Sequence, residues 1–132
     1  MDFSAIDARL LSHPGASKVF QPKWGWWCYW VGGKQFACEF MVGPDVDRPY
    51  AGRHMVSLKC DPAWSERLRE QCPDAIFPAY YSDGRTWISV DLDAVGRAFP
   101  EDLLFELCDH SYALVFAKLT KKMQREIAGP KE

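Results

Sequence analysis

Trp24-Gly25-Trp26-Trp27-Cys28-Tyr29-Trp30-Val31-Gly32-Gly33-Lys34-Gln35-Phe36-Ala37-Cys38-Glu39-Phe40 is the stretch of sequence that decides the fold of this chain. Two adjacent glycines, Gly32 and Gly33, divide it into two runs that are rich in aromatic and other apolar residues. A tight turn needs positive φ angles, which glycine adopts at little cost. The stretch therefore predicts an antiparallel β-hairpin that turns at the two glycines.

A two-residue turn would fix the register of this hairpin, with Tyr29 opposite Phe36 and Trp27 opposite Cys38. Side chains alternate between the two faces of a strand, so each face should carry its own set. The expected core face consists of Trp27, Tyr29, Val31, Phe36, Cys38 and Phe40. The expected outer face consists of Trp26, Cys28, Trp30, Gln35, Ala37 and Glu39. In this register Cys28 and Cys38 lie on opposite faces, so we expect no disulfide between them.

Periodicity and capping residues predict the elements on both sides of the hairpin. In chain order they are a helix over 3–12, the two hairpin strands, a strand over 55–60, a helix over 62–72, a strand over 86–92, a long helix that starts at Pro100, and a short helix over 121–127. Asp61 is expected to cap the second helix, and Thr120 the last. We therefore expect one α+β domain over residues 1–132, with helices on one face of an antiparallel sheet and the order α-β-β-β-α-β-α up to the long helix, before the last short helix.

Length and hydropathy limit the class of protein. The chain has 132 residues, the size of one ordinary domain. No apolar run approaches the roughly 20 residues that a membrane span requires. The first residues do not show the basic segment and apolar segment of a secretory signal. We expect no membrane association and a cytoplasmic location.

Cysteines and histidines do not form a metal-binding pattern. The five cysteines are Cys28, Cys38, Cys60, Cys72 and Cys108, and no two of them form a C-x-x-C pair. The three histidines stand apart from one another at positions 13, 54 and 110. Because metal sites need clustered ligands, we expect no metal, no cofactor and buried, reduced thiols.

Charge is distributed unevenly along the chain, although the net charge is only −2. Residues 1–60 carry a net charge of +2, residues 61–117 carry −7 and residues 118–132 carry +3. Phosphate neutralisation supplies much of the affinity of nucleic-acid binders. A basic surface would therefore have to combine residues from the two ends of the chain.

Several short motifs together resemble the MmcQ/YjbR family. In order along the chain they are Pro14-Gly15, Val31-Gly32-Gly33-Lys34-x-Phe36-Ala37, Val56-x-Leu58-Lys59-Cys60-Asp61-Pro62, Trp87, Asp109-His110-Ser111-Tyr112 and Lys118-Leu119-x-Lys121-Lys122. The resemblance covers about residues 10–127. It implies a CyaY-like (frataxin-like) α+β fold and a DNA-binding protein with a double-wing motif. One founding member is associated with mitomycin resistance, and the resemblance implies no shared set of catalytic residues.

Two segments depart from the family pattern. The segment before the predicted strand over 86–92 reads Tyr80-Tyr81-Ser82-Asp83-Gly84-Arg85-Thr86-Trp87 and lacks the histidines and lysine common in relatives. Arg85 is its only cation, beside Asp83, which weakens a phosphate-binding role for this wing. Residues 43–54 are longer than in many relatives, and they form either an enlarged wing or, slightly favoured, a surface insertion.

Five cations are candidate DNA contacts. Lys34, Lys59 and Arg85 would lie on the hairpin and neighbouring wings, and Lys121 and Lys122 would extend the surface from the last helix. Exposed strand lysines also prevent edge-to-edge pairing, and cations near a helix end also complement its dipole. The sequence leaves both interpretations open for these residues.

Three tryptophans, Trp26, Trp30 and Trp87, are candidates for a ligand-binding face. Leaving large apolar side chains in water forgoes roughly 1.5–3 kcal/mol each, so three indoles outside the core suggest a partner. This face could stack on bases, hold an aromatic small molecule or contact a partner protein, and a role in drug resistance is one of these alternatives. Alternatively the register is wrong by one residue, or residues 43–54 fold over the indoles.

Catalytic motifs are absent from the sequence. Adjacent helical residues point in different directions, so Asp109 and His110 form no dyad. Ser111 and Tyr112 fall on the stripe that the long helix should bury. No Gly-rich phosphate loop, G-x-S-x-G or H-E-x-x-H motif occurs. We expect no enzymatic activity.

Overall fold

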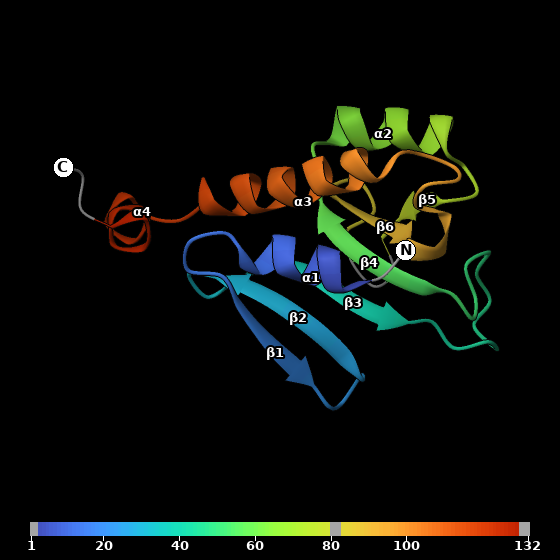
Figure 1. The fold of residues 1–132 in the computed structure, drawn as a ribbon, viewed down its shortest axis with the longest axis horizontal. Coiled ribbons are helices and arrows are strands. Elements are labelled where there is room, and N and C mark those ends of the chain that lie inside the picture. The colour runs from blue at the N-terminus through green and yellow to red at the C-terminus, as the bar shows by residue number, and fades with distance from the viewer. Residues whose placement is uncertain (1–2, 80–82, 130–132) are drawn as a thin grey trace.

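The computed structural model describes residues 3–79 and 83–129 (Figure 1). In chain order its elements are α1 (Phe3–Leu11), β1 (Ser17–Gln21), β2 (Trp26–Val31), β3 (Lys34–Met41), β4 (His54–Lys59), α2 (Pro62–Gln71), β5 (Ile76–Pro78), β6 (Trp87–Asp91), the 3-10 helix η1 (Leu92–Ala94), α3 (Glu101–Phe116) and α4 (Lys121–Ala128). The expectation for Tyr80-Tyr81-Ser82 lies outside the described residues. None of the described helices is long and apolar enough to cross a membrane.

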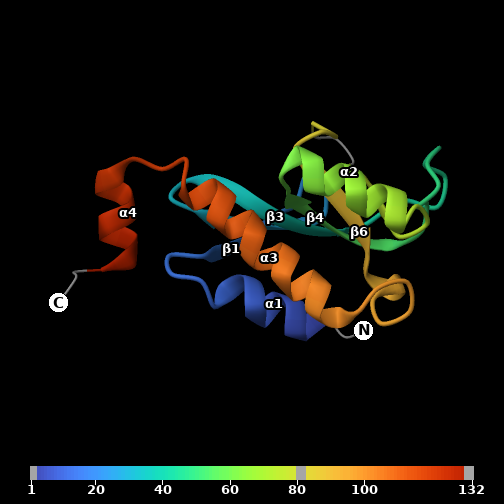
Figure 2. The same ribbon diagram turned by 90° about the horizontal axis from the view of Figure 1, so that it is seen from above.

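Six strands form one antiparallel sheet in the order β1-β2-β3-β4-β6-β5. Figures 1 and 2 show α1 and α3 side by side over the sheet, α2 beside α3, and α4 beyond the end of α3. Asp61 caps α2 and Thr120 caps α4, as predicted, because each side-chain oxygen accepts a backbone N–H of the first turn. The predicted α+β domain with an antiparallel sheet is confirmed.

The predicted element order was wrong because it lacked two strands, β1 and β5. All residues of β1 are exposed or only partly buried, so its sequence shows no alternation of polar and apolar residues. β5 is only three residues long and ends at Pro78. Both are edge strands. The exposure of β1 and the short length of β5 leave no clear sequence pattern.

The hairpin formed by β2 and β3 turns at residues 32–33 as predicted, but its register changes after the first pairs. Next to Trp30 a β-bulge leaves Phe36 as an extra residue in β3, so Tyr29 pairs with Ala37. Such a bulge sets two residues of one strand against one residue of its partner. The predicted pairing is therefore wrong in the half of the hairpin that lies farther from the turn.

The bulge reverses the faces predicted for the rest of β3. Ala37 belongs to the core under the helices, whereas Cys38 and Phe40 lie on the opposite face. Cys28 and Cys38, predicted on opposite faces, are direct partners in the sheet, and both are buried free thiols. Trp27, predicted in the core, is 39% exposed. One extra residue accounts for the change on β3, because side chains alternate with a period of two.

Both faces of the sheet carry a buried apolar cluster. The larger one lies under α1, α2 and α3 and includes the predicted helix stripe from Leu104 to Val115. The smaller one lies on the face away from the helices and consists of Cys28, Cys38, Phe40, Val42, Tyr50, Met55 and Phe77. Trp26, Trp30 and Val46 pack against it. Residues 43–54 therefore cover part of this face, which was one alternative to an open tryptophan surface.

The hydroxyl of Ser111 joins α3 to the sheet at the bulge. It donates a hydrogen bond to the Phe36 carbonyl (2.5 Å) and accepts one from the Lys59 backbone N–H (2.9 Å). The serine is fully buried. The β3–β4 ladder ends at the pair Ala37–Leu58, and the serine binds the backbone of the next residue on each strand. Unpaired buried backbone groups are costly, so this one side chain stabilises the end of the ladder.

Two neighbours of this serine attach α3 to the N-terminal part of the chain. Asp109 accepts hydrogen bonds from the guanidinium of Arg9 on α1. The hydroxyl of Tyr112 donates to the carbonyl of Pro14, in the loop between α1 and β1. The motif from Asp109 to Tyr112 therefore holds the helix layer on the sheet.

Replacing Ser111 tests this linkage. Ser111→Ala leaves two backbone groups without a partner, each at a cost of about 1–3 kcal/mol, so we expect the free energy of unfolding to fall by roughly 2 kcal/mol or more. Chemical denaturation measures the change. Ser17→Ala, at an exposed position in β1, is the matched control and should change stability by less than about 0.5 kcal/mol. Equal effects of the two substitutions would show that the bridge does not stabilise the fold.

Candidate functional site

A cavity of about 450 Å³ opens at the end of the sheet where β3 begins and β4 ends. The two strands do not pair beyond Ala37 and Leu58, and the C-terminal part of α3 lies beneath the gap between them. The lining residues come from β3, β4, α3 and the turn after α3; they are Lys34, Gln35, Lys59, Val115 and Lys118. The bulge and the Ser111 bridge thus border a cavity lined mainly by lysines.

Three of the five residues that line this cavity are lysines, and none of the five is acidic. Within residues 3–79 and 83–129, Lys34, Lys59 and Lys118 form no ion pair. Lys34 and Lys118 are exposed, and Lys59 is partly buried. Positive charges that converge without an acidic partner raise the local concentration of anions. The cavity is therefore suited to bind an anion.

Lys118 was not among the candidate residues predicted from the sequence. It lies in the quoted motif Lys118-Leu119-x-Lys121-Lys122, but sequence alone does not show that its neighbours in space are Lys34 and Lys59. The signal that could have identified it is its position just after the long helix. Local sequence patterns do not show which end of the sheet this helix reaches, so Lys118 could not be placed beside Lys34 and Lys59.

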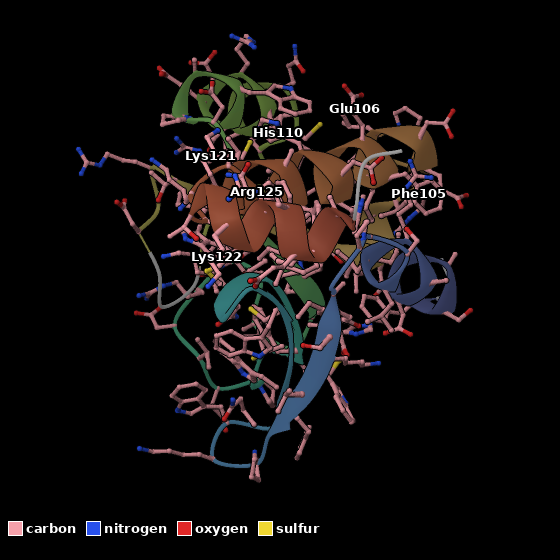
Figure 3. All side chains as sticks on the ribbon, turned by 90° about the vertical axis from the view of Figure 1, so that its left-hand side faces the viewer. Phe105, Glu106, His110, Lys121, Lys122 and Arg125 are labelled. Carbon is pink, nitrogen blue, oxygen red and sulfur yellow. The ribbon has the colours of Figure 1, made fainter. Side chains whose placement is uncertain are left out.

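α4 brings more cations to the same end of the molecule. A Cβ atom added to Gly32, in the β2–β3 turn, would lie 2.7 Å from Leu119 and 3.2 Å from Met123. The turn therefore has no room for a larger residue against the start of α4. Figure 3 views this end and labels the cations Lys121, Lys122 and Arg125 of α4. The predicted candidates Lys121 and Lys122 thus share one end of the molecule with Lys34 and Lys59.

Arg85 also lies at this end, but its charge is partly compensated. The Cys60 N–H donates to the Thr86 carbonyl at 2.9 Å, which places the segment before β6 beside the end of β4. The Arg85 side chain is 87% exposed, and its Nε lies 3.6 Å from a carboxylate oxygen of Asp83. Arg85 is therefore a weaker candidate for an anion contact than the three lysines of the cavity.

Trp26, Trp30 and Trp87 lie on the sheet face away from the helices. Trp30 is the cross-strand partner of Gln35, and Trp87 is the partner of Lys59. The two indoles thus lie beside residues of the lysine cavity. Trp26 lies further along β2, where its ring stacks on Phe40 with centroids 4.4 Å apart. The structure therefore places Trp87 next to the predicted Lys59, and Trp30 next to Gln35 of the same cavity.

The long loop over residues 43–54 lies at the opposite end of the sheet, between the end of β3 and the start of β4. Arg53, one of its cations, binds Asp91 at 3.0 Å and the Asp74 carbonyl at 2.9 Å. Tyr50 is buried in the smaller apolar cluster. The loop therefore packs on the fold and takes no part in the lysine cavity.

The cysteines have the properties of structural thiols. Burial raises the pKa of Cys38 and of Cys108 to about 12, and that of Cys60 to about 11. A thiol with a raised pKa is a poor nucleophile at neutral pH. Among the described residues, no group of three or more potential ligands could hold a metal ion.

His110 anchors the segment that follows Lys59. Its Nε2 accepts a hydrogen bond from the Asp61 N–H at 3.1 Å. Its ring forms a T-shaped contact with the Trp64 ring, with the two ring centroids 4.7 Å apart. Figure 3 shows His110 on α3 pointing toward α2. Burial lowers the pKa of His110 below 6.5. Nearby Asp61 and Glu106 raise this pKa, but their effect is smaller than that of burial. The neutral ring is the form that can accept this bond.

The fold defines a class of small α+β domains, and comparison with known proteins gives the family. The YjbR family model matches residues 11–114, so this chain belongs to the YjbR family, as the sequence motifs predicted. No curated protein sequence matches the chain significantly.

Two solved structures share the fold. A Deinococcus radiodurans protein, DR2400, with a DUF419 domain is 27% identical, with a TM-score of 0.78 over 96% of this chain and 88% of that chain. A Pseudomonas syringae protein is 19% identical, with a TM-score of 0.67 over 86% of this chain and 98% of that chain. At 19% identity, the comparison with the Pseudomonas syringae protein shows a shared fold only. Neither name assigns an activity.

Acidification tests the role of His110. The unfolded chain binds a proton on this ring more readily than the folded one, so its contribution to stability is full above about pH 6.5 and declines as pH falls toward the lowered pKa. We expect the stability difference between the wild type and His110→Gln to be larger at about pH 7.5 than at about pH 5. Urea unfolding at both pH values measures it. A difference that does not change with pH would contradict the neutral-acceptor role.

Proposed function

We propose that this protein is a non-catalytic DNA-binding protein that holds the phosphate backbone at its lysine end. The observation that carries this proposal is the cavity lined by Lys34, Lys59 and Lys118, none of which has a carboxylate partner among the described residues. In the proposal the β2–β3 turn and the segment before β6 act as two wings beside the cavity. Lys121, Lys122 and, more weakly, Arg85 extend the contact.

The overall charge of −2 is compatible with this proposal because binding depends on local charge. Several carboxylates of the acidic middle of the sequence already have cationic partners, such as Asp91 with Arg53 and Asp109 with Arg9. The unpaired lysines gather at one end. A protein with this distribution would present one end to the anionic backbone and keep the rest of its surface away from it.

The side chains that could suggest an enzyme have structural partners, which supports a binding role. Asp109 binds Arg9 and His13, whereas His110 binds Asp61, so the two neighbours do not act on a common substrate. The hydroxyl of Ser111 is held by two backbone groups. The proposal includes no cofactor and a cytoplasmic location, where chromosomal DNA is accessible.

A binding module for an aromatic small molecule or a partner protein was the alternative. It would use the face with Trp26, Trp30 and Trp87. That face is partly filled by the smaller apolar cluster, and Trp26 already stacks on Phe40. The alternative predicts binding that is insensitive to salt, whereas a phosphate contact weakens steeply with salt. Salt dependence therefore separates the two functions.

Titration of a labelled DNA duplex at increasing salt tests the proposal. Three to five phosphate contacts predict a loss of affinity of about 40- to 500-fold between about 50 mM and 200 mM salt. Each of Lys34→Gln, Lys59→Gln and Lys118→Gln should weaken binding and reduce the slope of log K against log salt by about 1.

Arg48→Gln is the matched control, because it removes one exposed positive charge from the loop at the opposite end of the sheet. It should leave both the affinity and the slope nearly unchanged. If Arg48→Gln and Lys59→Gln weaken binding equally, the contact is non-specific attraction to the whole molecule. Absence of binding to DNA at low salt would refute the proposal.

A further inference from the structure

Two cross-strand pairs lie at the lysine end of the sheet, on the face away from the helices. The register pairs Trp30 of β2 with Gln35 of β3, and Lys59 of β4 with Trp87 of β6. Gln35 and Lys59 both line the cavity, so Trp30 lies on its β2 side and Trp87 on its β6 side.

Strand alternation fixes the face on which these two pairs lie. Cys28, two residues before Trp30, belongs to the smaller apolar cluster on that face. Ser57 and Ser89, two residues before Lys59 and two after Trp87, are hydrogen-bonded partners on the same face. Both indoles are partly exposed, so part of each ring remains available. Neither ring is needed to fill the main core under the helices.

A positive cavity between two partly exposed indoles matches one chemical pattern, which is a phosphate with unsaturated rings on both sides. Lysines can hold the phosphate and indoles can stack on bases, as in proteins that bind single strands. In a duplex the faces of the bases are covered by their neighbours, and exposing them costs energy. The indoles would therefore add affinity only for a strand whose bases are unpaired.

We infer that the preferred ligand of this site is single-stranded nucleic acid, with its backbone on Lys34, Lys59 and Lys118 and its bases on Trp30 and Trp87. This inference rests on the proposed function and narrows it. Duplex DNA reaches the lysines but not the indoles, so it binds through charge alone. Binding of single strands has both a salt-dependent part from the lysines and a stacking part that depends on the bases.

Three labelled oligonucleotides of equal length test the inference: a single strand, a duplex, and an abasic single strand that keeps the backbone charge. A length of about 12 nucleotides lies within the usual range of single-strand sites. We expect the single strand to bind at least about fivefold more tightly than the abasic strand, since stacking contributes about 5- to 150-fold per base. This comparison uses the wild-type protein, so it does not depend on any variant folding.

Tryptophan variants locate the stacking. Trp30→Leu and Trp87→Leu should each weaken binding of the single strand by about fivefold or more and leave binding of the abasic strand unchanged. Trp27→Leu is the matched control, because Trp27 lies on the other face of β2 and is 39% exposed. It should not change binding of any of the three oligonucleotides. Circular dichroism of each variant confirms that it is folded.

The outcomes separate this inference from the proposed function. If the three oligonucleotides bind equally and Lys59→Gln weakens all of them, the protein binds backbone charge and the inference is overturned. If Trp27→Leu has the same effect as Trp30→Leu, stacking occurs elsewhere and the assigned face is wrong. If none of the three oligonucleotides binds at low salt, the proposed function fails and the inference fails with it.

Discussion

The two hydrogen bonds of the Ser111 hydroxyl are the interaction on which the rest of this structure depends. The hydroxyl supplies a donor and an acceptor to two strands at the point where their own ladder stops. The β-bulge at Phe36 removes a regular pairing, and a buried backbone group without a partner would make that bulge costly. With the serine in place, β3 and β4 can separate while both remain attached to α3. The strand ends then do not continue the sheet. Instead their residues Lys34, Gln35 and Lys59 line a cavity.

The motif around this serine shows why residue types that suggest catalysis can have an architectural role. Asp109, His110, Ser111 and Tyr112 occupy successive positions on α3, so their side chains point to different neighbours. They contact α1, the start of α2, the sheet and the loop before β1, respectively. A catalytic dyad needs two groups that converge on one substrate. Here four polar groups diverge, and each one attaches the long helix to a different part of the domain.

The sequence predicted the parts of this fold that depend on local chemistry. The two-glycine turn, the Asp61 and Thr120 caps and the apolar stripe of α3 all follow from neighbouring residues, and all are confirmed. The bulge could not be predicted, because its partner is Ser111, some 75 residues away. Without the bulge, Ala37 and Cys38 were assigned to the wrong faces. The edge strand β1 buries too little to show a pattern, and β5 is too short to show one.

The candidate site was only partly accessible to the same reasoning. Lys34 and Lys59 were identified one by one, as exposed strand lysines, and Trp30 and Trp87 as indoles outside the core. Their proximity depends on the strand order β2-β3-β4-β6, which no local pattern contains. Lys118 joins them because α3 ends beneath the separated strands. The function proposed for this end of the molecule thus arises from topology more than from any single motif.

Mapping of NMR chemical shifts during titration with a single-stranded oligonucleotide tests the central claim most directly, because it reports where the ligand lies. The account predicts saturable shifts for the backbone amides of Lys34, Lys59 and Lys118 and for the indole N–H groups of Trp30 and Trp87. The amides of residues 43–54, at the opposite end of the sheet, should not move. Shifts centred on that loop, with the lysine end unchanged, would contradict the account.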